Sequence, residues 1–413
     1  MDYGLIGKNL SHSYSKLIHG LIGDYDYEIQ NLAQNELGDF LKKADFKGIN
    51  VTIPYKKAVM PFCHTLSPTA KKLGNVNTLV KDEKGRLHGH NTDYLGLAYM
   101  VEKAGLELEG REVLILGSGG AGLTARALAE DRGAAGVSTV SRSGPLNYEN
   151  VYELCKGANV IINASPVGMY PNTGESPLDL AAFTKAEAVL DLIYNPIYTR
   201  LLSSARQLGI KNANGLTMLA AQAMQAAELF FDGRLEAQNS IDQIVEKLTY
   251  KTANIVLVGM PGSGKSTVGR ALAALSGKTF VDTDKLIEKE KGRSTFDILS
   301  SKGQAYFRDL EAEILARVAK ENSQIIASGG GAVLRPENRD NLRQNAFVVF
   351  LDRALDELAT EGRPLSADPE KLRAMYVTRL PIYKAVSDKI VLNDKGPKEA
   401  AAHILDLFEA YKF

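Results

Sequence analysis

The sequence predicts an α/β protein with two nucleotide-binding units in tandem, and three observations predict this fold class. Residues 259–266 fit the pattern G-x-x-x-x-G-K-S and follow the apolar run 255–258. Residues 117–122 fit G-x-G-x-x-G between an apolar run and an alanine-rich segment. Such glycine turns bind phosphate groups when they join a strand to a helix. The third observation is position: the first of these patterns begins only at Gly259, so a separate unit precedes it.

The bulk composition is that of an ordinary soluble globular protein. The chain has 413 residues, and 49 Lys and Arg balance 49 Asp and Glu, which gives a formal net charge of zero. This balance supplies no overall field for nucleic acid or an anionic membrane. The chain has only two cysteines, no run of 18 apolar residues and no signal-like start. We therefore expect a cytoplasmic protein without a nucleic-acid or membrane partner.

The first unit is predicted to open with strand 3–7, a polar loop and a helix through residues 17–22. Ser13 and Ser15 could direct two hydroxyls at one small anion, or simply cap the helix. Strand 48–54 should stop at its proline, with a helix beginning at residues 55–57. Lys56 would then lie at a strand-to-helix corner, where catalytic groups are often displayed, although a solvated lysine is the alternative.

Polar side chains gather in a predicted hairpin over residues 74–93, with its turn at residues 82–85. Asn77 and Asn91 each precede a threonine, and Asp93 follows the second pair. Amide and hydroxyl groups suit a polyhydroxylated ligand, and a carboxylate can pair with an ammonium group. The hairpin is therefore a candidate substrate site.

Regular α/β alternation begins at strand 112–116, which leads into the glycine turn 117–122 and a helix to about residue 130. The next strand, 136–140, is followed by Ser141 and Arg142 rather than by an acidic residue. An acidic residue there binds the ribose 2′-hydroxyl of NAD, whereas arginine suits the 2′-phosphate of NADP. NADP is therefore predicted over NAD. Strands 160–163 and 188–192 and a long helix 216–231 complete the pattern.

Seven ordered motifs make this unit resemble the shikimate dehydrogenases over its whole length. They are residues 12–15, 50–56, 76–78, 91–93, 117–122, 163–169 and 215–222. The resemblance implies that residues 1–94 and 216–248 form a domain that binds 3-dehydroshikimate, and that residues 95–215 form a Rossmann domain that binds NADP. A broader quinate/shikimate dehydrogenase that uses NAD is the alternative enzyme.

The same resemblance assigns residue roles. Lys56 and Asp93 would be the catalytic pair. The substrate-binding residues would be Ser13, Ser15, Thr52, Asn77, Asn91, Tyr194 and Gln222. The cofactor-binding residues would be Gly117, Ser118, Gly119, Gly120, Ala121, Gly122, Ser141, Arg142 and Met218. Two departures from the family are Ser141, where asparagine is usual, and the lack of any tryptophan.

A short linker is predicted at residues 249–253, where a helix that runs through residue 248 is expected to end, before a strand that begins by residue 255. Downstream of the second glycine pattern, Asp282 and Asp284 follow strand 279–281. One carboxylate could serve Mg²⁺ and the other a substrate hydroxyl. Arg308 on a predicted helix could hold a carboxylate or pair with Glu311 three residues on.

Strand 324–327 leads into three consecutive glycines, and strand 347–351 follows. The motifs above, with these glycines and residues 363–365 and 379–383, resemble the shikimate kinases over residues 254–413. The resemblance implies shikimate binding by Asp284, Arg308, Gly330 and Arg379, and catalysis by Lys265, Asp284 and Arg363. MgATP would be bound by Gly262, Ser263, Gly264, Lys265, Ser266 and Thr267, with Ser266 and Asp282 toward the metal. The lid before Arg363 is shorter than usual and lacks a stacking arginine.

The leading hypothesis is a bifunctional enzyme that reduces 3-dehydroshikimate with NADPH and then phosphorylates shikimate with MgATP, two consecutive steps of one pathway. The alternative is that only the dehydrogenase is active, while the kinase-like domain is a binding or scaffold module. The oligomeric state and any channelling of shikimate stay open.

Overall fold

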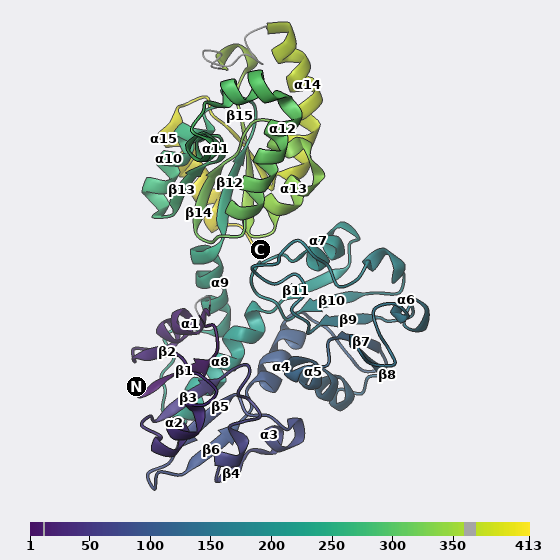
Figure 1. The fold of residues 1–413 in the computed structure, drawn as a ribbon, viewed down its shortest axis with the longest axis vertical. Helices are drawn as coiled ribbons and strands as arrows, with labels where there is room; N and C mark the ends of the chain where they lie inside the picture. The colour runs from purple at the N-terminus through teal and green to yellow at the C-terminus, as the bar shows by residue number, and fades with distance from the viewer. Residues whose placement is uncertain (11–12, 359–368) are drawn as a thin grey trace. The chain divides into compact units, whose positions relative to one another are not determined.

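The computed structural model describes residues 1–10, 13–358 and 369–413. These residues divide into two units. The first comprises residues 1–169, 175–194 and 204–248, and the second comprises residues 170–174, 195–203 and 249–413. Two sheets lie in the first unit and one in the second (Figure 1). In the described part of the chain, no helix is both long and apolar enough to cross a bilayer.

The first sheet is mixed and has the strand order β2-β1-β3-β5-β6-β4. Its strands are β1 (Tyr3–Gly7), β2 (Tyr27–Asn31), β3 (Gly48–Val51), β4 (Thr65–Leu66), β5 (Thr78–Lys81) and β6 (Leu87–His90). Strands β5 and β6 form the predicted hairpin, which is confirmed. Strand β3 runs antiparallel to β5, with Asn50 opposite Thr78.

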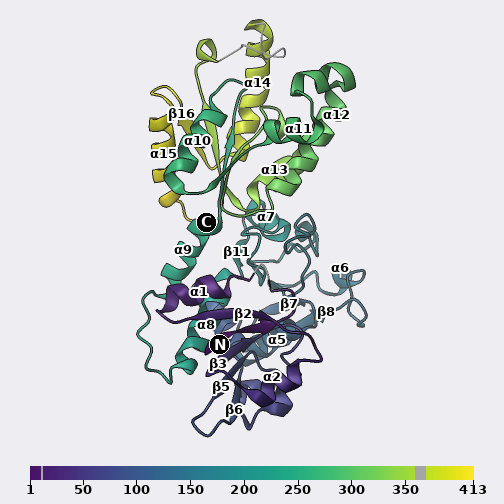
Figure 2. The same cartoon turned by 60° about the vertical axis from the view of Figure 1, so that its left-hand side comes forward.

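Helices cover this sheet, and the long helix 216–231 predicted from the sequence returns to it as α8. The helical elements are α1 (Ser15–Ile22), α2 (Leu37–Lys43), η1 (Met60–Phe62), α3 (Pro68–Leu73), α8 (Leu216–Phe230) and α9 (Ile241–Thr252). Ile18 and Ile22 of α1 share a buried cluster with Ala220 and Ala223 of α8. Figures 1 and 2 show α8 beside the first sheet.

Two local predictions are wrong. Strand β3 ends at Val51, and no helix begins at residues 55–57. Turns take its place, because the Tyr55 N–H bonds to the Thr52 carbonyl and the Met60 N–H to the Lys57 carbonyl. Pro54 cannot donate a helical hydrogen bond and restricts the residue before it. Helix α9 ends at Thr252, within residues 249–253 where its end was predicted.

The second sheet is entirely parallel, in the order β11-β10-β9-β7-β8. Its strands are β7 (Glu112–Leu116), β8 (Gly136–Val140), β9 (Val160–Asn163), β10 (Ala188–Asp191) and β11 (Lys211–Asn214). The accompanying helices are α4 (Asp93–Lys103), α5 (Gly120–Asp131), α6 (Val151–Leu154), η2 (Leu180–Ala182) and α7 (Arg200–Gln207). Strand β7 lies between β8 and β9, and this switch point is where such sheets bind ligands.

The third sheet is also parallel, in the order β13-β14-β12-β15-β16. Its strands are β12 (Asn254–Val258), β13 (Thr279–Asp282), β14 (Gln324–Ala327), β15 (Ala346–Asp352) and β16 (Lys389–Leu392). The helices are α10 (Lys265–Ser276), α11 (Thr283–Lys291), α12 (Thr295–Val318), η3 (Ala332–Leu334), α13 (Pro336–Arg343), η4 (Leu355–Glu357), α14 (Pro369–Val386) and α15 (Pro397–Glu409). Figure 1 shows α10 and α15 on one side of this sheet and α12, α13 and α14 on the other.

Candidate active sites

Lys56 and Asp93 meet in the first unit, as the sequence predicts for a catalytic pair. The Lys56 Nζ lies 2.6 Å from Asp93 Oδ2, although 37 residues separate them in the chain. Lys56 stands on the turn after β3, and Asp93 is the first residue of α4. Their side chains are 25% and 14% exposed, so the pair is partly shielded yet reachable by a ligand.

The hairpin supplies the next layer of this site. The Asn77 Nδ2 donates to Asp93 Oδ1 at 2.9 Å, and the Thr92 N–H donates to Asn77 Oδ1 at 2.8 Å. Gln222 of α8 joins through its Oε1, which accepts from the Thr92 hydroxyl at 3.4 Å. Asn91 is buried, and its Nδ2 donates to Asn75 Oδ1 at 2.7 Å. Asn77 is thus the predicted binding residue in direct contact with the pair.

Ser13 and Ser15 lie together at the start of α1, with their hydroxyls 3.1 Å apart. The Ser13 Oγ also accepts from the Ser15 N–H at 3.2 Å, so one hydroxyl stabilises the first turn of the helix. Tyr14, between them, packs its ring 5.1 Å from that of Tyr194. Burial raises the pKa of Tyr194, which therefore stays a neutral hydroxyl donor. The backbone of Thr52 is fixed by its N–H bond to the Ile6 carbonyl.

The glycine turn after β7 has the form that a dinucleotide needs. A Cβ on Gly122 would lie 2.0 Å from the Gly117 carbonyl oxygen, so the turn can close only with glycine there. A Cβ on Gly119 or Gly120 would meet no described atom within 4 Å. The protein's own packing therefore does not demand those two glycines, whereas close approach of a pyrophosphate favours glycine at position 119, the second glycine of the pattern. Ser118 and Ala121 belong to the same turn and the start of α5.

Ser141 and Arg142 emerge beside this turn, because Val140 of β8 pairs with Leu116 of β7 at the same sheet edge. The Gly117 N–H bonds to the Val140 carbonyl at 2.9 Å. Arg142 is exposed, which leaves its guanidinium available to a phosphate. Met218, on α8, packs in the cluster that contains Leu97 and Met100.

In the second unit, the glycine turn 259–264 leads into α10. Gly262 and Gly264 have φ values of 89° and 95°, which favour glycine, and α10 begins at Lys265. The Lys265 Nζ donates to the carbonyls of Gly259 and Met260 at 3.0 and 2.8 Å. Ser263 is buried, and Thr267 is in the first turn of the helix.

Ser266 and Asp282 form the predicted metal-side pair, because the Ser266 hydroxyl donates to Asp282 Oδ2 at 2.6 Å. A hydroxyl and a carboxylate are the oxygen ligands that Mg²⁺ uses together with nucleotide phosphates and water. Asp282 also caps α11 by accepting from the Lys285 N–H at 3.1 Å. The described residues include no cluster of three His, Cys, Asp or Glu able to hold a metal alone.

Asp284, in the first turn of α11, lies in the middle of the pocket. Burial, together with the charges of Glu311 and Asp282, raises the pKa of its carboxyl to about 6. Lys265 and Arg308 act in the opposite direction. Its Oδ1 is buried and has no hydrogen-bond partner among the described residues. A buried carboxylate oxygen of this kind is available to a ligand hydroxyl.

Arginines line the other end of the pocket. Arg308 and Glu311 of α12 pair at 2.6 Å, with side chains 11% and 0% exposed. Arg379 of α14 donates to the Gly330 carbonyl at 3.0 Å, and the buried Tyr383 hydroxyl donates to the same oxygen. A Cβ on Gly331 would lie 2.0 Å from the Arg308 Nη2, so any other residue there would displace the guanidinium from this position.

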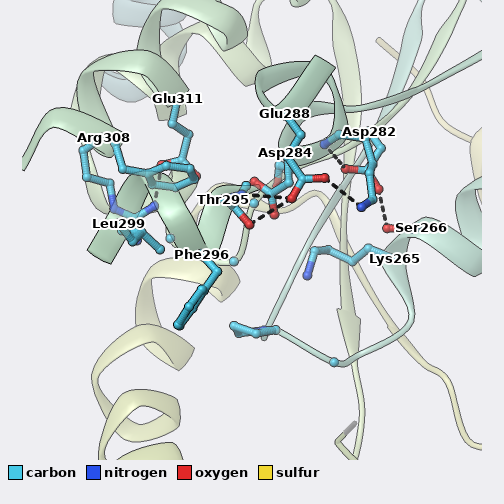
Figure 3. Close-up of a pocket in the computed structure, with 18 of the residues that line it drawn as sticks. Lys265, Ser266, Asp282, Asp284, Glu288, Thr295, Phe296, Leu299, Arg308 and Glu311 are labelled. Carbon is cyan, nitrogen blue, oxygen red and sulfur yellow. Dashed lines mark hydrogen bonds and ion pairs between the residues drawn. The ribbon is translucent and has the colours of Figure 1, made fainter. Parts of the chain in front are cut away.

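The cavity between these groups has a volume of about 370 Å³. Its lining includes Lys265, Ser266, Asp284, Arg308 and Arg379. Figure 3 shows Asp284 between the Arg308–Glu311 end and the Lys265–Ser266–Asp282 end. A bound molecule can therefore offer a carboxylate to the arginines and a hydroxyl to Asp284 while a phosphate lies at the glycine turn.

One contact at this site was missed from the sequence. The Nδ2 of Asn393, just after β16, donates to the Ser263 carbonyl at 2.9 Å. The sequence contained a signal for this contact, because a polar residue just after a parallel strand lies at the same sheet edge as the glycine turn. It was missed because strand β16 was not predicted. The predicted Arg363 and residues 359–362 of its lid lie outside the described residues.

Comparisons with known proteins assign both units. A family model described as the shikimate dehydrogenase substrate binding domain matches residues 5–79, and one described as shikimate kinase matches residues 261–409. A shikimate dehydrogenase (NADP(+)) of Clostridium perfringens is 34% identical over 271 residues, which cover 60% of this chain and 97% of that protein. A shikimate kinase of Symbiobacterium thermophilum is 43% identical over 164 residues, which cover 37% of this chain and 94% of that protein.

Solved structures resemble the first unit. Shikimate 5-dehydrogenase from Thermus thermophilus, in complex with NADP(H) and shikimate, has a TM-score of 0.53 and 30% identity, and covers 60% of this chain and 99% of that one. A chorismate mutase/shikimate 5-dehydrogenase fusion protein from Clostridium acetobutylicum has a TM-score of 0.56 and 38% identity, over 60% and 96% of the two chains. Quinate dehydrogenase from Corynebacterium glutamicum, in complex with NAD, has a TM-score of 0.54 and 27% identity, over 60% and 98%.

The folds and sites define a chain with two enzyme classes, a dinucleotide-dependent oxidoreductase followed by a P-loop kinase. The chain belongs to the shikimate dehydrogenase family over its first part and to the shikimate kinase family over its second.

Proposed function

We propose that this chain reduces 3-dehydroshikimate to shikimate with NADPH and then phosphorylates shikimate with MgATP. The observation that carries the proposal is that one chain holds both the Lys56–Asp93 pair and a kinase pocket with its arginines, carboxylates and glycine turn in place. A cytoplasmic enzyme acting on small molecules fits both families. The domain boundaries that belong to this proposal are 1–94 with 216–248 for the substrate domain, 95–215 for the NADP domain and 254–413 for the kinase domain.

In the first reaction, bound NADPH would supply the hydride, held by the glycine turn and by Arg142 at its 2′-phosphate. The substrate oxygen then gains electron density, and the Lys56 ammonium is the group that protonates it. Asp93 orients the Lys56 side chain through the 2.6 Å hydrogen bond between Lys56 Nζ and Asp93 Oδ2. Ser13 and Ser15 would bind the substrate carboxylate, and Asn77 and Gln222 its hydroxyls.

In the second reaction, Arg308 and Arg379 would bind the carboxylate of shikimate. The planar guanidinium group of an arginine can donate two parallel hydrogen bonds to a carboxylate and so fix its orientation. Asp284 would accept the proton of the hydroxyl that attacks the phosphoryl group. Lys265 and the amides at the start of α10 would bind the nucleotide phosphates, and Ser266 and Asp282 would hold Mg²⁺. Catalysis here is mainly positioning and stabilisation of charge, and this pocket supplies both.

A double assay on the purified chain tests the proposal. With 3-dehydroshikimate, NADPH and MgATP present, we expect NADPH absorbance to fall and ADP to appear only once shikimate forms. Leaving out NADPH should suppress both signals, and a Lys265→Ala chain should keep only the first. NADPH consumption without ADP would reduce the kinase unit to a binding or scaffold module. Faster turnover of quinate with NAD⁺ would favour the broader dehydrogenase instead.

A further inference from the structure

A chain of buried hydrogen bonds runs from the core of the first sheet to the Lys56–Asp93 pair. It begins at Tyr27 of β2, whose hydroxyl donates to Asn50 Oδ1 at 2.7 Å. The Asn50 Nδ2 donates to the Thr78 hydroxyl oxygen at 3.1 Å. The Thr78 hydroxyl donates to Asn77 Oδ1 at 3.1 Å, and the Asn77 Nδ2 reaches Asp93 Oδ1.

The hydrogen-bonded residues from Tyr27 to Asn77 are all shielded from water. Tyr27 and Asn77 are 3% exposed, Asn50 is 6% exposed and Thr78 is fully buried. Hydrogen bonds at low local dielectric are stronger and more directional than exposed ones. A buried polar group that loses its partner also keeps the full cost of desolvation, so the arrangement is strongly preferred over alternatives.

The direction of each bond follows from donor chemistry. The Asn50 amide is oriented because its Nδ2 also donates to the Asn77 main-chain carbonyl at 3.4 Å, and a carbonyl can only accept. The Asn50 Oδ1 is therefore left to accept from Tyr27, and the Nδ2 also serves Thr78. Thr78 has one hydroxyl proton, and acceptance from Asn50 directs that proton to Asn77 Oδ1. With its oxygen held by Thr78 and by the Thr92 N–H, Asn77 must present its Nδ2 to Asp93.

We propose that Asn50 and Thr78 are positioning residues of the dehydrogenase: they fix the Asn77 amide and, through it, the Asp93 carboxylate that directs Lys56. Neither touches the Lys56–Asp93 pair, and neither was assigned a catalytic or binding role from the sequence, although both lie in motifs of the family resemblance. The inference rests on the proposed reduction of 3-dehydroshikimate. The register of the sheet supports this role, because Asn50 of β3 lies directly opposite Thr78 of β5 and the two side chains can therefore bond.

Thr78→Val tests the inference, since valine keeps the shape of threonine and removes the hydroxyl. We expect kcat/KM for 3-dehydroshikimate to fall about tenfold, because small misplacement of a catalytic group costs this much or more. KM for NADPH should not change. Thr78→Ser restores the hydroxyl and should recover most of the rate. Leu79→Val is the stability control, because Leu79 is equally buried but faces the opposite side of β5.

An Asn77→Ala background separates positioning from general destabilisation. If Thr78 acts through Asn77, Thr78→Val should change kcat/KM little further in that background, whereas independent effects would multiply. Tyr27→Phe, at the far end of the chain, provides a second variant should Thr78→Val not fold.

Three outcomes would overturn the inference. They are wild-type kcat/KM in Thr78→Val, equal losses with and without Asn77, or a loss as large in Leu79→Val. If Thr78→Val does not fold, a wild-type kcat/KM in Tyr27→Phe would overturn the inference instead. A wild-type chain that does not reduce 3-dehydroshikimate would instead overturn the proposed function, and this inference with it. ADP formation from added shikimate, measured on each preparation, shows that the second unit is intact.

Discussion

The two active sites differ in how their buried polar atoms are satisfied. In the first, Lys56, Asp93 and Asn77 form hydrogen bonds with one another at 2.6 to 2.9 Å. In the second, Asp284 Oδ1 and Glu311 Oε1 are buried without a hydrogen-bond partner among the described residues, and so is Arg308 Nε. The first site is complete in itself, whereas the second keeps bonding capacity for a ligand.

This difference assigns different tasks to the two sets of side chains. A buried polar atom without a partner costs about 1–3 kcal/mol, and a substrate that supplies the partner recovers this free energy as affinity. Groups that already hold one another contribute geometry instead. We therefore expect substitutions at the first site to act mainly on kcat and those at the second mainly on KM.

The largest effect is expected for Lys56→Ala. Loss of the proton donor should lower dehydrogenase turnover by roughly 10²- to 10⁴-fold, because general acid catalysis contributes about this factor. NADPH affinity should change little, since Lys56 lies on the turn after β3 and not at the glycine turn of β7. Stopped-flow NADPH oxidation and NADPH fluorescence titration measure the two quantities.

Lys57→Ala is the matched control, because Lys57 is the next residue and is exposed. It should retain the wild-type rate, and the kinase activity of both variants should be unchanged. Equal turnover in Lys56→Ala and wild type would remove Lys56 from the mechanism and with it the contrast between the two sites.

A smaller effect, confined to the kinase, is expected for Arg308→Lys. Lysine keeps a positive charge beside the buried Glu311 but loses the planar guanidinium. A hydrogen bond to a charged group contributes about 1.5–3 kcal/mol, so KM for shikimate should rise about 10- to 100-fold. Initial-rate measurements of ADP formation should show little change in kcat or in KM for ATP.

Arg335→Lys controls for the general loss of an arginine–carboxylate pair. Arg335 pairs with Asp309 at 2.6 Å on the surface, where both partners are more exposed than Arg308 and Glu311. It should leave KM for shikimate unchanged. If Arg308→Lys lowers kcat at constant KM, the second site is organised like the first, and the comparison fails.

The sequence was sufficient for the parts of each site that local patterns determine. Both glycine turns lie between a strand and a helix, and the Arg308–Glu311 pair follows from helical spacing. Most strands begin and end where apolar runs do. The family resemblance added the partnership of Lys56 with Asp93, which no local pattern contains.

What the sequence could not supply depends on which strands are neighbours. Asn50 and Thr78 are 28 residues apart and meet only because β3 lies next to β5 in a mixed sheet. Asn393 reaches the kinase glycine turn only through β16, at the far edge of its sheet. The helix wrongly predicted to begin at residues 55–57 is replaced by turns, which the Tyr55 N–H bond to the Thr52 carbonyl and the Met60 N–H bond to the Lys57 carbonyl close.

The smallest effect concerns the pH dependence of the first unit. His19 is 1% exposed, its ring stacks 3.7 Å from that of Tyr27, and its Nδ1 lies 2.6 Å from the Tyr25 hydroxyl. Burial lowers the pKa of His19 to about 3. Below pH 6.5 the unfolded chain therefore binds a proton at this histidine that the folded chain does not bind.

Stability must then decrease as the pH falls from 6.5 toward 3. From pH 6.5 to 5.5 the loss due to His19 should be about 1 kcal/mol, since one pH unit corresponds to at most about 1.4 kcal/mol per proton. His19→Phe keeps an aromatic ring and should remove this part of the pH dependence of the free energy of unfolding. Urea unfolding, with hydrogen exchange of α1 as the readout of the first unit, measures it. Tyr25→Phe removes the same hydrogen bond but no group that titrates in this range, so it should lower stability equally at both pH values. Identical slopes for wild type and His19→Phe would mean that His19 takes up a proton as readily in the folded unit as in the unfolded chain, so that the first sheet would tolerate a buried charge beside Tyr27.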